Sequence, residues 1–166
     1  MTSTYVIALG SNRRGRHGAP AAELRAALKA IGNVTCTSRI IETAPLGAAV
    51  RRFANATAVI ETNEAPPALL NRLKAIEVAF GRRPGQRWRD RVIDLDIILW
   101  SAGAWSSEAL TIPHSEFRDR RFVLDPLREI VPDWRDPLTG LSVRQLAARL
   151  TRRLHALRAH GAGAGP

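Results

Sequence analysis

The sequence contains little cysteine, few aromatic residues and no long apolar run. Its single cysteine, Cys36, excludes an internal disulfide, and we expect it to be a small core or strand residue because free cysteine is usually buried. No apolar run approaches the roughly 18–20 residues of a membrane span. The N-terminus lacks the basic and apolar regions of a signal peptide, so we expect a cytoplasmic protein that does not associate with membranes.

Lysine is also scarce, and this makes the charge of the chain unusual. Lys29 and Lys74 are the only lysines, so the formal net charge of +10 comes almost entirely from arginine. Such a balance suits a polyanionic partner, which could be a nucleic acid, a nucleotide triphosphate or an acidic surface. Heavy use of arginine also arises in GC-rich genomes. The positions of the arginines must therefore decide between these readings.

The residue pattern predicts one α+β domain over residues 1–160 and a disordered tail over 161–166. Apolar runs and alternation predict strands over 5–9, 34–43, 53–62 and 92–100. Apolar stripes at helical spacing predict helices over 20–31, 66–80 and 122–130, and a last helix that begins after Ser142. The order β-α-β-β-α-β is typical of a ferredoxin-like fold, in which two helices pack on one face of an antiparallel sheet. The later helices are C-terminal additions to this core.

Two carboxylates interrupt the most strand-like run in the chain. Ile93, Leu95, Ile97 and Leu99 alternate on one predicted face, whereas Asp94 and Asp96 share the other face with Val92, Ile98 and Trp100. Residues two apart in a strand point the same way and lie about 6.6 Å apart. Like charges this close repel unless cations compensate, and Mg²⁺ binds one or two carboxylates together with phosphate oxygens. The alternative is an edge strand whose carboxylates face water or pair with arginines.

The segment just before these carboxylates is rich in arginine. It carries Arg82, Arg83, Arg87, Arg89 and Arg91, with Trp88 among them. Guanidinium groups match phosphate geometry through paired hydrogen bonds. A basic loop that binds nothing, or that binds RNA, is the alternative. Because a carboxylate pair would repel a nucleic-acid backbone, we favour a magnesium–nucleotide site over residues 82–96.

Two further patterns are less specific. The run from Gly10 to His17 nearly spells a P-loop, but Arg16 and His17 stand where lysine and serine or threonine belong, so we reject that reading. A tight turn with a flexible arm accounts for it. Phe53 and Asn55 share a strand face, and Phe122 could supply an opposing ring, which would suit a flat heterocycle. Such residues are more often part of a core.

Taken together, the motifs resemble the 6-hydroxymethyl-7,8-dihydropterin pyrophosphokinases of folate biosynthesis. The similarity spans residues 5–150. It rests on several ordered motifs: A-L-G-S-N (8–12), A-P-L-G (44–47), F-A-N-A (53–56), I-E-x-x-x-G-R (76–82), R-W-x-x-R-x-I-D-L-D-I-I (87–98) and L-T-I-P-H…R-x-F-V-L-x-P-L (110–127). The ferredoxin-like sheet of that family agrees with the element order above.

The resemblance implies a role for each matching residue. Asp94 and Asp96 would hold two Mg²⁺ ions between ATP and the pterin, while Arg82 and Arg91 would bind the phosphates. Glu77 matches an acidic position near the substrates. The other expected ATP contacts are Arg87, Trp88, Ile98, Thr111, His114 and Arg120. The expected pterin contacts are Thr43, Leu46, Phe53, Asn55 and Phe122.

The resemblance also implies the reaction and its partners. The pterin hydroxymethyl oxygen would attack the β-phosphorus of ATP and release AMP, with catalysis by positioning and charge neutralisation. We expect the loops at 10–18, 48–52 and 82–91 to close over the substrates. We expect a monomer that binds no nucleic acid.

Some positions depart from the family pattern. Arg89 and Asp90 replace the usual Gly-Pro before Arg91, which leaves the direction of Arg91 open, and Arg83 is only a candidate phosphate ligand. The alternatives are an RNA-binding module and a catalytically inactive relative. An RNA-binding sheet would present aromatic residues on adjacent strands and no paired carboxylates. Because only 5% of the residues are aromatic, that alternative fits poorly.

Overall fold

The computed structural model describes residues 1–43, 52–81 and 91–161. The elements in these ranges, in chain order, are β1 (Ser3–Ser11), α1 (Pro20–Ile31), β2 (Val34–Thr37), β3 (Ile41–Thr43), β4 (Phe53–Thr62), α2 (Pro66–Ala79), β5 (Asp94–Trp100), β6 (Trp105–Ser106), β7 (Thr111–Ile112), a 3-10 turn η1 (Phe117–Asp119), α3 (Arg121–Ile130) and α4 (Val143–Gly161).

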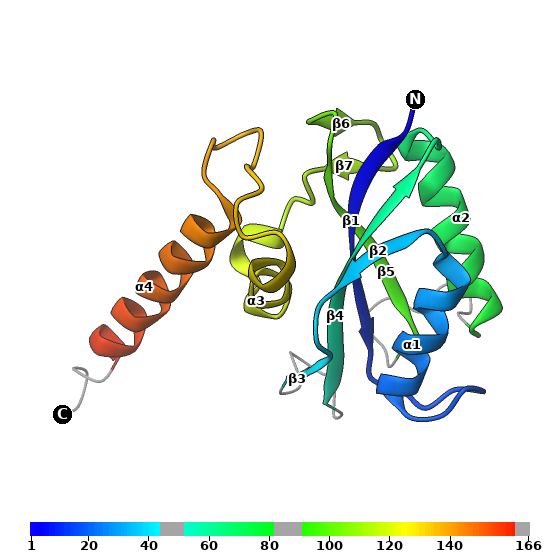
Figure 1. Cartoon of the computed structure of the whole chain (residues 1–166). Coiled ribbons are helices and arrows are strands. Elements are labelled where there is room, and N and C mark those ends of the chain that lie inside the picture. The colour runs from blue at the N-terminus through cyan, green and yellow to red at the C-terminus, as the bar shows by residue number, and fades with distance from the viewer. Residues whose placement is uncertain (44–51, 82–90, 162–166) are drawn as a thin grey trace.

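The main sheet has the order β2-β4-β1-β5, and β3 pairs with β4 beyond the end of β2. Every pairing in it is antiparallel. Strand β4 lies between β1 and β2, which makes β1-α1-β2 a split β-α-β unit (Figure 1). The predicted α+β, ferredoxin-like core is confirmed.

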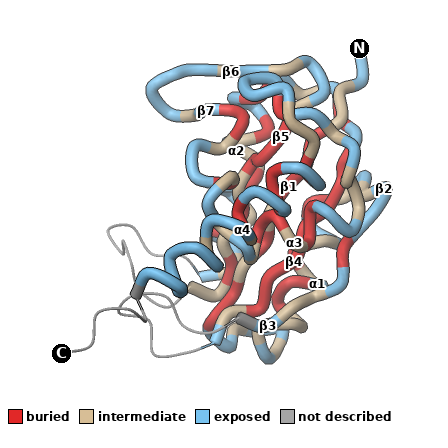
Figure 2. The backbone as a smooth tube through the Cα atoms, turned by 90° about the vertical axis from the view of Figure 1, so that its left-hand side faces the viewer, coloured by how far each residue is buried: buried red, intermediate tan, exposed pale blue. Residues whose placement is uncertain are grey.

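Helices cover both faces of the sheet. Figure 1 shows α1 and α2 on one side and α3 and α4 on the other. The first core lies under α1 and α2 and includes Tyr5, Ile7 and Leu9 of β1. The second core lies under α3 and α4 and includes Val6, Val59 and Leu99. Among the described residues, much of β1, β4 and β5 between these cores is buried (Figure 2).

The predicted strand over 34–43 is broken in two. Ser38 leaves the regular ladder between β2 and β3, yet its N–H donates to the carbonyl of Thr57 at 2.9 Å and its hydroxyl accepts the Thr57 N–H at 2.9 Å. The Ser38 hydroxyl thus takes the place of a backbone carbonyl as the acceptor for the Thr57 N–H. Cys36, which we expected to be buried, is exposed. The reason is that β2 is an edge strand, and three of its four residues face solvent.

A bulge also changes the faces of the last strand residues. The register between β1 and β5 shifts between Val6 and Ile7. Leu99 therefore joins Ile98 in the second core, and the Trp100 ring stacks on Tyr5 at 6.0 Å on the first side. The predicted alternation is correct for Asp94 to Ile97 and wrong for Leu99 and Trp100.

Local signals account for the helix ends. Gly32 follows α1 with a φ of 68°, and its N–H donates to the carbonyl of Leu28. Before α4, the Ser142 N–H donates to Oε1 of Gln145 at 2.9 Å, and the Gln145 N–H donates to the Ser142 hydroxyl at 3.2 Å. This is the reciprocal capping box that the sequence predicts. Helix α4 ends at Gly161, and residues 162–166 of the predicted tail lie outside the described ranges.

Helix α4 is attached to the body through its first half. The turn before it holds Asp136, which is 1% exposed and accepts two hydrogen bonds from the guanidinium of Arg118 at 2.6 and 2.7 Å.

Among the described residues, no helix is both long and apolar enough to cross a membrane.

Candidate active site

Three neighbouring strands place the predicted site residues in two rows. Gly10 of β1 pairs with Asn55 on one side and with Asp94 on the other. Ala8 in the same way separates Thr57 from Asp96. Because strands lie about 4.8 Å apart, Asn55 and Asp94 are separated by roughly 10 Å across a floor of small residues.

Glycine in the middle of this floor permits a close approach. A Cβ atom added at Gly10 would lie 3.2 Å from Oδ1 of Asn55, which is tighter than an ordinary contact. The second core covers the Val6–Val59 end of this face, whereas the row of Asn55, Gly10 and Asp94 lies at the opposite end. The row of Asn55, Gly10 and Asp94 therefore lies beyond the described part of the second core.

The two strand carboxylates differ in their surroundings. Asp94 accepts a hydrogen bond from Nη1 of Arg91 at 2.8 Å. Burial, together with the negative charges of Asp94 and Glu77, raises the pKa of Asp96 to about 7, against the opposing effect of Arg120 and Arg91. Repulsion between poorly hydrated carboxylates is the cost that a bound cation relieves.

Glu77 brings a third carboxylate to this place from α2. It is 3% exposed, and its Oε1 accepts the N–H of Leu95 at 2.8 Å. The helical pattern of the sequence could also have indicated Glu77. This residue continues the buried stripe of Leu69 and Leu73, where an apolar residue is usual. In the sequence, only the family resemblance pointed to this residue.

The donor set suits magnesium bound together with a substrate. Among the described residues, no group of three or more histidines, cysteines and carboxylates could enclose a metal ion. Mg²⁺ ordinarily takes one or two protein carboxylates and completes its octahedron with water and phosphate oxygens. Asp94 and Asp96, half-buried and side by side, meet that requirement.

His114 and Arg120 approach the carboxylates from the segment before α3. The His114 N–H donates to the carbonyl of Ile98 at 3.0 Å, which holds this segment against β5. Burial and the positive charge of Arg120 lower the pKa of His114, so the imidazole is neutral at pH 7. Arg120 forms an ion pair with Glu116, and its guanidinium lies 5.7 Å from the centre of the Phe122 ring.

The two remaining predicted ATP contacts in the described ranges lie close by. Ile98 is 1% exposed and belongs to the second core, so only its backbone is placed to meet a ligand. Thr111 is exposed on β7, where it pairs with Ser106. Their contact with adenine stays a prediction.

The predicted pterin residues gather where β3, β4 and α3 meet. Thr43 pairs with Phe53 at the start of β4, and Asn55, which is 5% exposed, follows two residues later. Phe122 is half-buried at the start of α3, the helix that packs on β4. Leu46 lies outside the described residues, as do Arg82, Arg83, Arg87, Trp88, Arg89 and Asp90.

The segment after β1 is anchored rather than a flexible arm. The guanidinium of Arg16 donates to the carbonyl of Ala79. Nδ1 of His17 lies 2.8 Å from Oε2 of the buried Glu23, and its ring lies 4.7 Å from that of Phe80. These contacts bind the segment to α1 and α2, and the sequence pattern alone does not predict them. Asn12, which the sequence presents only as part of a motif, is 2% exposed beside Arg91.

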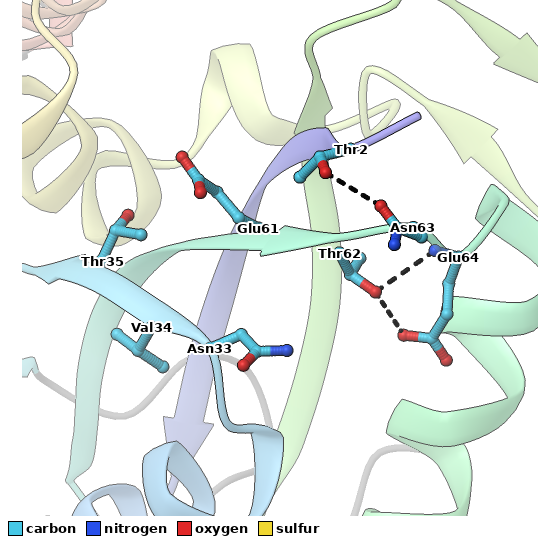
Figure 3. A pocket seen from close by; sticks show the side chains of 8 residues that line it. All are labelled: Thr2, Asn33, Val34, Thr35, Glu61, Thr62, Asn63 and Glu64. Carbon is cyan, nitrogen blue, oxygen red and sulfur yellow. Dashed lines mark hydrogen bonds between the residues drawn. The ribbon is translucent and has the colours of Figure 1, made fainter.

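A pocket of about 730 Å³ lies elsewhere on the molecule (Figure 3). Thr2, Asn33, Glu61 and Asn63 are among the residues that line it. It adjoins the Ser3 end of β1, about 27 Å along the strand from Ser11. None of the predicted site residues lines it, so it is separate from the carboxylate site.

Comparison with known proteins identifies the family to which the chain belongs. The sequence model of 7,8-dihydro-6-hydroxymethylpterin-pyrophosphokinase (HPPK) matches residues 6–132. A Haemophilus influenzae protein named 2-amino-4-hydroxy-6-hydroxymethyldihydropteridine pyrophosphokinase is 41% identical over 136 residues, which are 78% of this chain and 82% of the relative. A Methylorubrum extorquens protein of the same name is 39% identical over 153 residues, which cover 90% of this chain and 94% of the relative.

Solved structures agree in fold. The crystal structure of wild-type Plasmodium falciparum HPPK-DHPS superposes with a TM-score of 0.73 at 16% identity and covers 93% of this chain. This chain spans 42% of that longer one. At this identity the likeness concerns the fold alone. The sequence matches carry the assignment, and the chain belongs to the 7,8-dihydro-6-hydroxymethylpterin-pyrophosphokinase family, a family of enzymes.

Proposed function

We propose that the protein transfers pyrophosphate from ATP to the hydroxymethyl group of 6-hydroxymethyl-7,8-dihydropterin in folate biosynthesis, with release of AMP and dependence on Mg²⁺. The observation that carries the proposal is the pairing of Asn55 and Asp94 with Gly10 on adjacent strands. A polar edge for a heterocycle thus faces a carboxylate pair for a metal-bound polyphosphate. The family assignment supports the same reaction.

The reaction needs one bond to form and one to break at the β-phosphorus. The hydroxymethyl oxygen bonds to that phosphorus, the bond to the oxygen shared with the α-phosphate breaks, and the hydroxyl proton passes to solvent. Magnesium held by Asp94 and Asp96 would neutralise charge on the phosphate oxygens. Arg91 and Arg120, both close enough to Asp96 to affect its pKa, would donate hydrogen bonds to the transferred group.

The remaining proposed roles divide between the two substrates. Asn55 would pair with the hydrogen-bonding edge of the pterin, and Phe53 and Phe122 would stack on its faces. Thr43 and Leu46 would complete that pocket. Arg82, Arg87 and Trp88 would join His114 and Thr111 around ATP. No general base is required, because positioning and charge neutralisation dominate such transfers.

The test measures AMP by chromatography after the protein is mixed with ATP, Mg²⁺ and the hydroxymethyl pterin. We expect AMP only when all three are present. Asp94→Ala and Asp96→Ala should each lower the rate by at least about 100-fold, since each removes a metal ligand. Circular dichroism should show an unchanged fold. Near-normal turnover in either variant would remove the metal role, and a wild type that releases no pterin-dependent AMP would indicate an inactive relative.

A further inference from the structure

The end of β1 is joined to the start of β5 by a buried amide. Oδ1 of Asn12 accepts the N–H of Arg91 at 2.7 Å, and the N–H of Asn12 donates to the carbonyl of Arg91 at 3.1 Å. The two residues are 79 positions apart in the sequence. The regular β1–β5 pairing ends at Gly10 and Asp94, so this pair of hydrogen bonds continues the contact beyond the ladder.

Arg91, whose backbone Asn12 binds, places its guanidinium beside the strand carboxylates. Nη1 of Arg91 lies 2.8 Å from Oδ1 of Asp94. A continuous path therefore runs from the Asn12 amide through the Arg91 backbone to the predicted metal ligand. Arg91 is the first described residue after the gap at 82–90. The described contacts that fix its backbone come from Asn12.

We propose that Asn12 is a positioning residue for pyrophosphate transfer. Its carboxamide fixes the backbone of Arg91, so that the guanidinium is already aimed at the transferred phosphate group before the substrates bind. A donor that is fixed in advance stabilises the transition state without reorganisation, and a misplacement of about 1 Å can cost about 100-fold in rate. The inference rests on the proposed function, and it adds a residue that does not itself contact the substrates.

Because β1 is long and buried, we expect the loss of the Asn12 side-chain amide to have only a local effect. Nine residue pairs join β1 to β4, so the strand stays in place when one side-chain bond at its end is lost. Removing the Asn12 side chain leaves the Arg91 N–H without this acceptor, so that of the two bonds only the one from the Asn12 N–H to the Arg91 carbonyl still holds the Arg91 backbone. Ser11 is the matched control, because it is also fully buried and its hydroxyl contacts only the nearby Arg13 carbonyl, at 3.3 Å, among the described hydrogen bonds.

The experiment is a double-mutant cycle on steady-state AMP formation with varied pterin. We expect Asn12→Ala to lower kcat about 10- to 100-fold, with little change in the KM for the pterin, and Ser11→Ala to lower it less than about 3-fold. Asn12→Asp, which keeps the acceptor, should recover most of the rate. In an Arg91→Ala background, Asn12→Ala should have almost no further effect, because its action passes through Arg91.

The outcomes separate this inference from the proposed function. A wild type without pterin-dependent AMP release overturns both. An active wild type in which Asn12→Ala slows the Arg91→Ala enzyme by the same factor as the parent overturns the positioning role alone, as does a failure of Asn12→Asp to restore the rate. If Asn12→Ala does not fold, Asn12→Ser replaces it in the same cycle, since its shorter side chain withdraws the acceptor from the Arg91 N–H.

Discussion

At the scale of single residues, Asp96 links stability to function. Its pKa of about 7 lies above the value of 3.8 for an unperturbed aspartate, mainly because of burial. A raised pKa means that the contribution of this group to stability is fully present below about pH 4 and is lost as pH rises through about 7. In the absence of a cation, the ionised carboxylate therefore opposes folding at neutral pH.

Asp96→Asn should consequently raise the thermal midpoint of the metal-free protein at pH 8. The amide keeps nearly the same shape but carries no charge beside Asp94 and Glu77. The gain should shrink as pH falls towards 4 and the wild-type carboxyl becomes protonated. Thermal unfolding in EDTA across pH 4–9 measures this difference, while AMP release should be lost at every pH. A difference in midpoint that does not change with pH would show that charge repulsion is not the cause.

At the scale of elements, the site depends on the closeness of three strands. Gly10 lies between Asn55 and Asp94, and a side chain on it would project over the floor on which we propose that both substrates bind. Strand β1 is otherwise lined with larger residues that fill the two cores, such as Tyr5 and Ile7. A small residue at this position therefore serves ligand access more than packing.

Gly10→Val should lower kcat/KM for the pterin by more than about 10-fold, because its Cβ and methyl groups would displace Asn55 and occupy the floor. Gly10→Ala, which adds only the Cβ, should have a smaller effect. Since valine favours strands, the thermal midpoint should change little. Steady-state kinetics with varied pterin, together with thermal unfolding, separates the two effects. Equal kcat/KM in Gly10→Val and the wild type would place the pterin elsewhere.

At the scale of the whole molecule, the first half of α4 completes the second core. Val143, Leu146 and Leu150 are each at most 4% exposed, whereas Leu157 is 64% exposed. Figure 1 shows that the C-terminal end of α4 extends away from the body. The helix also carries no acidic residue, and some of the arginines outside the proposed site lie on it.

A chain that ends at Leu154 should keep its activity and unfold within a few degrees of the full chain. One that ends at Leu141 should not fold stably. Deleting Val143, Leu146 and Leu150 uncovers the apolar side chains of the second core that they pack against, which costs roughly 5 kcal/mol or more and is comparable with the entire stability of a small domain. Urea unfolding followed by circular dichroism compares the two truncations. A stable 1–141 chain would show that the second core does not need α4.

The local pattern was sufficient for elements whose causes lie close together in the sequence. Pro20 and Gly32 delimit α1, and Ser142 with Gln145 begins α4, because helix ends are set by bonds within one turn. The alternation over 94–97 likewise placed both aspartates on one strand face, since side chains repeat every second residue.

The sequence by itself thus determined the order of elements, the ends of the helices and the shared face of Asp94 and Asp96. Only the tertiary structure decided that Cys36 lies on an edge, that a bulge turns Leu99 to the second core, that Glu77 reaches β5, and that Asn12 reaches Arg91 just before it. Strand order, register shifts and contacts between distant residues depend on how the whole sheet and its helices pack. A pattern that repeats every two or 3.6 residues carries no information about them.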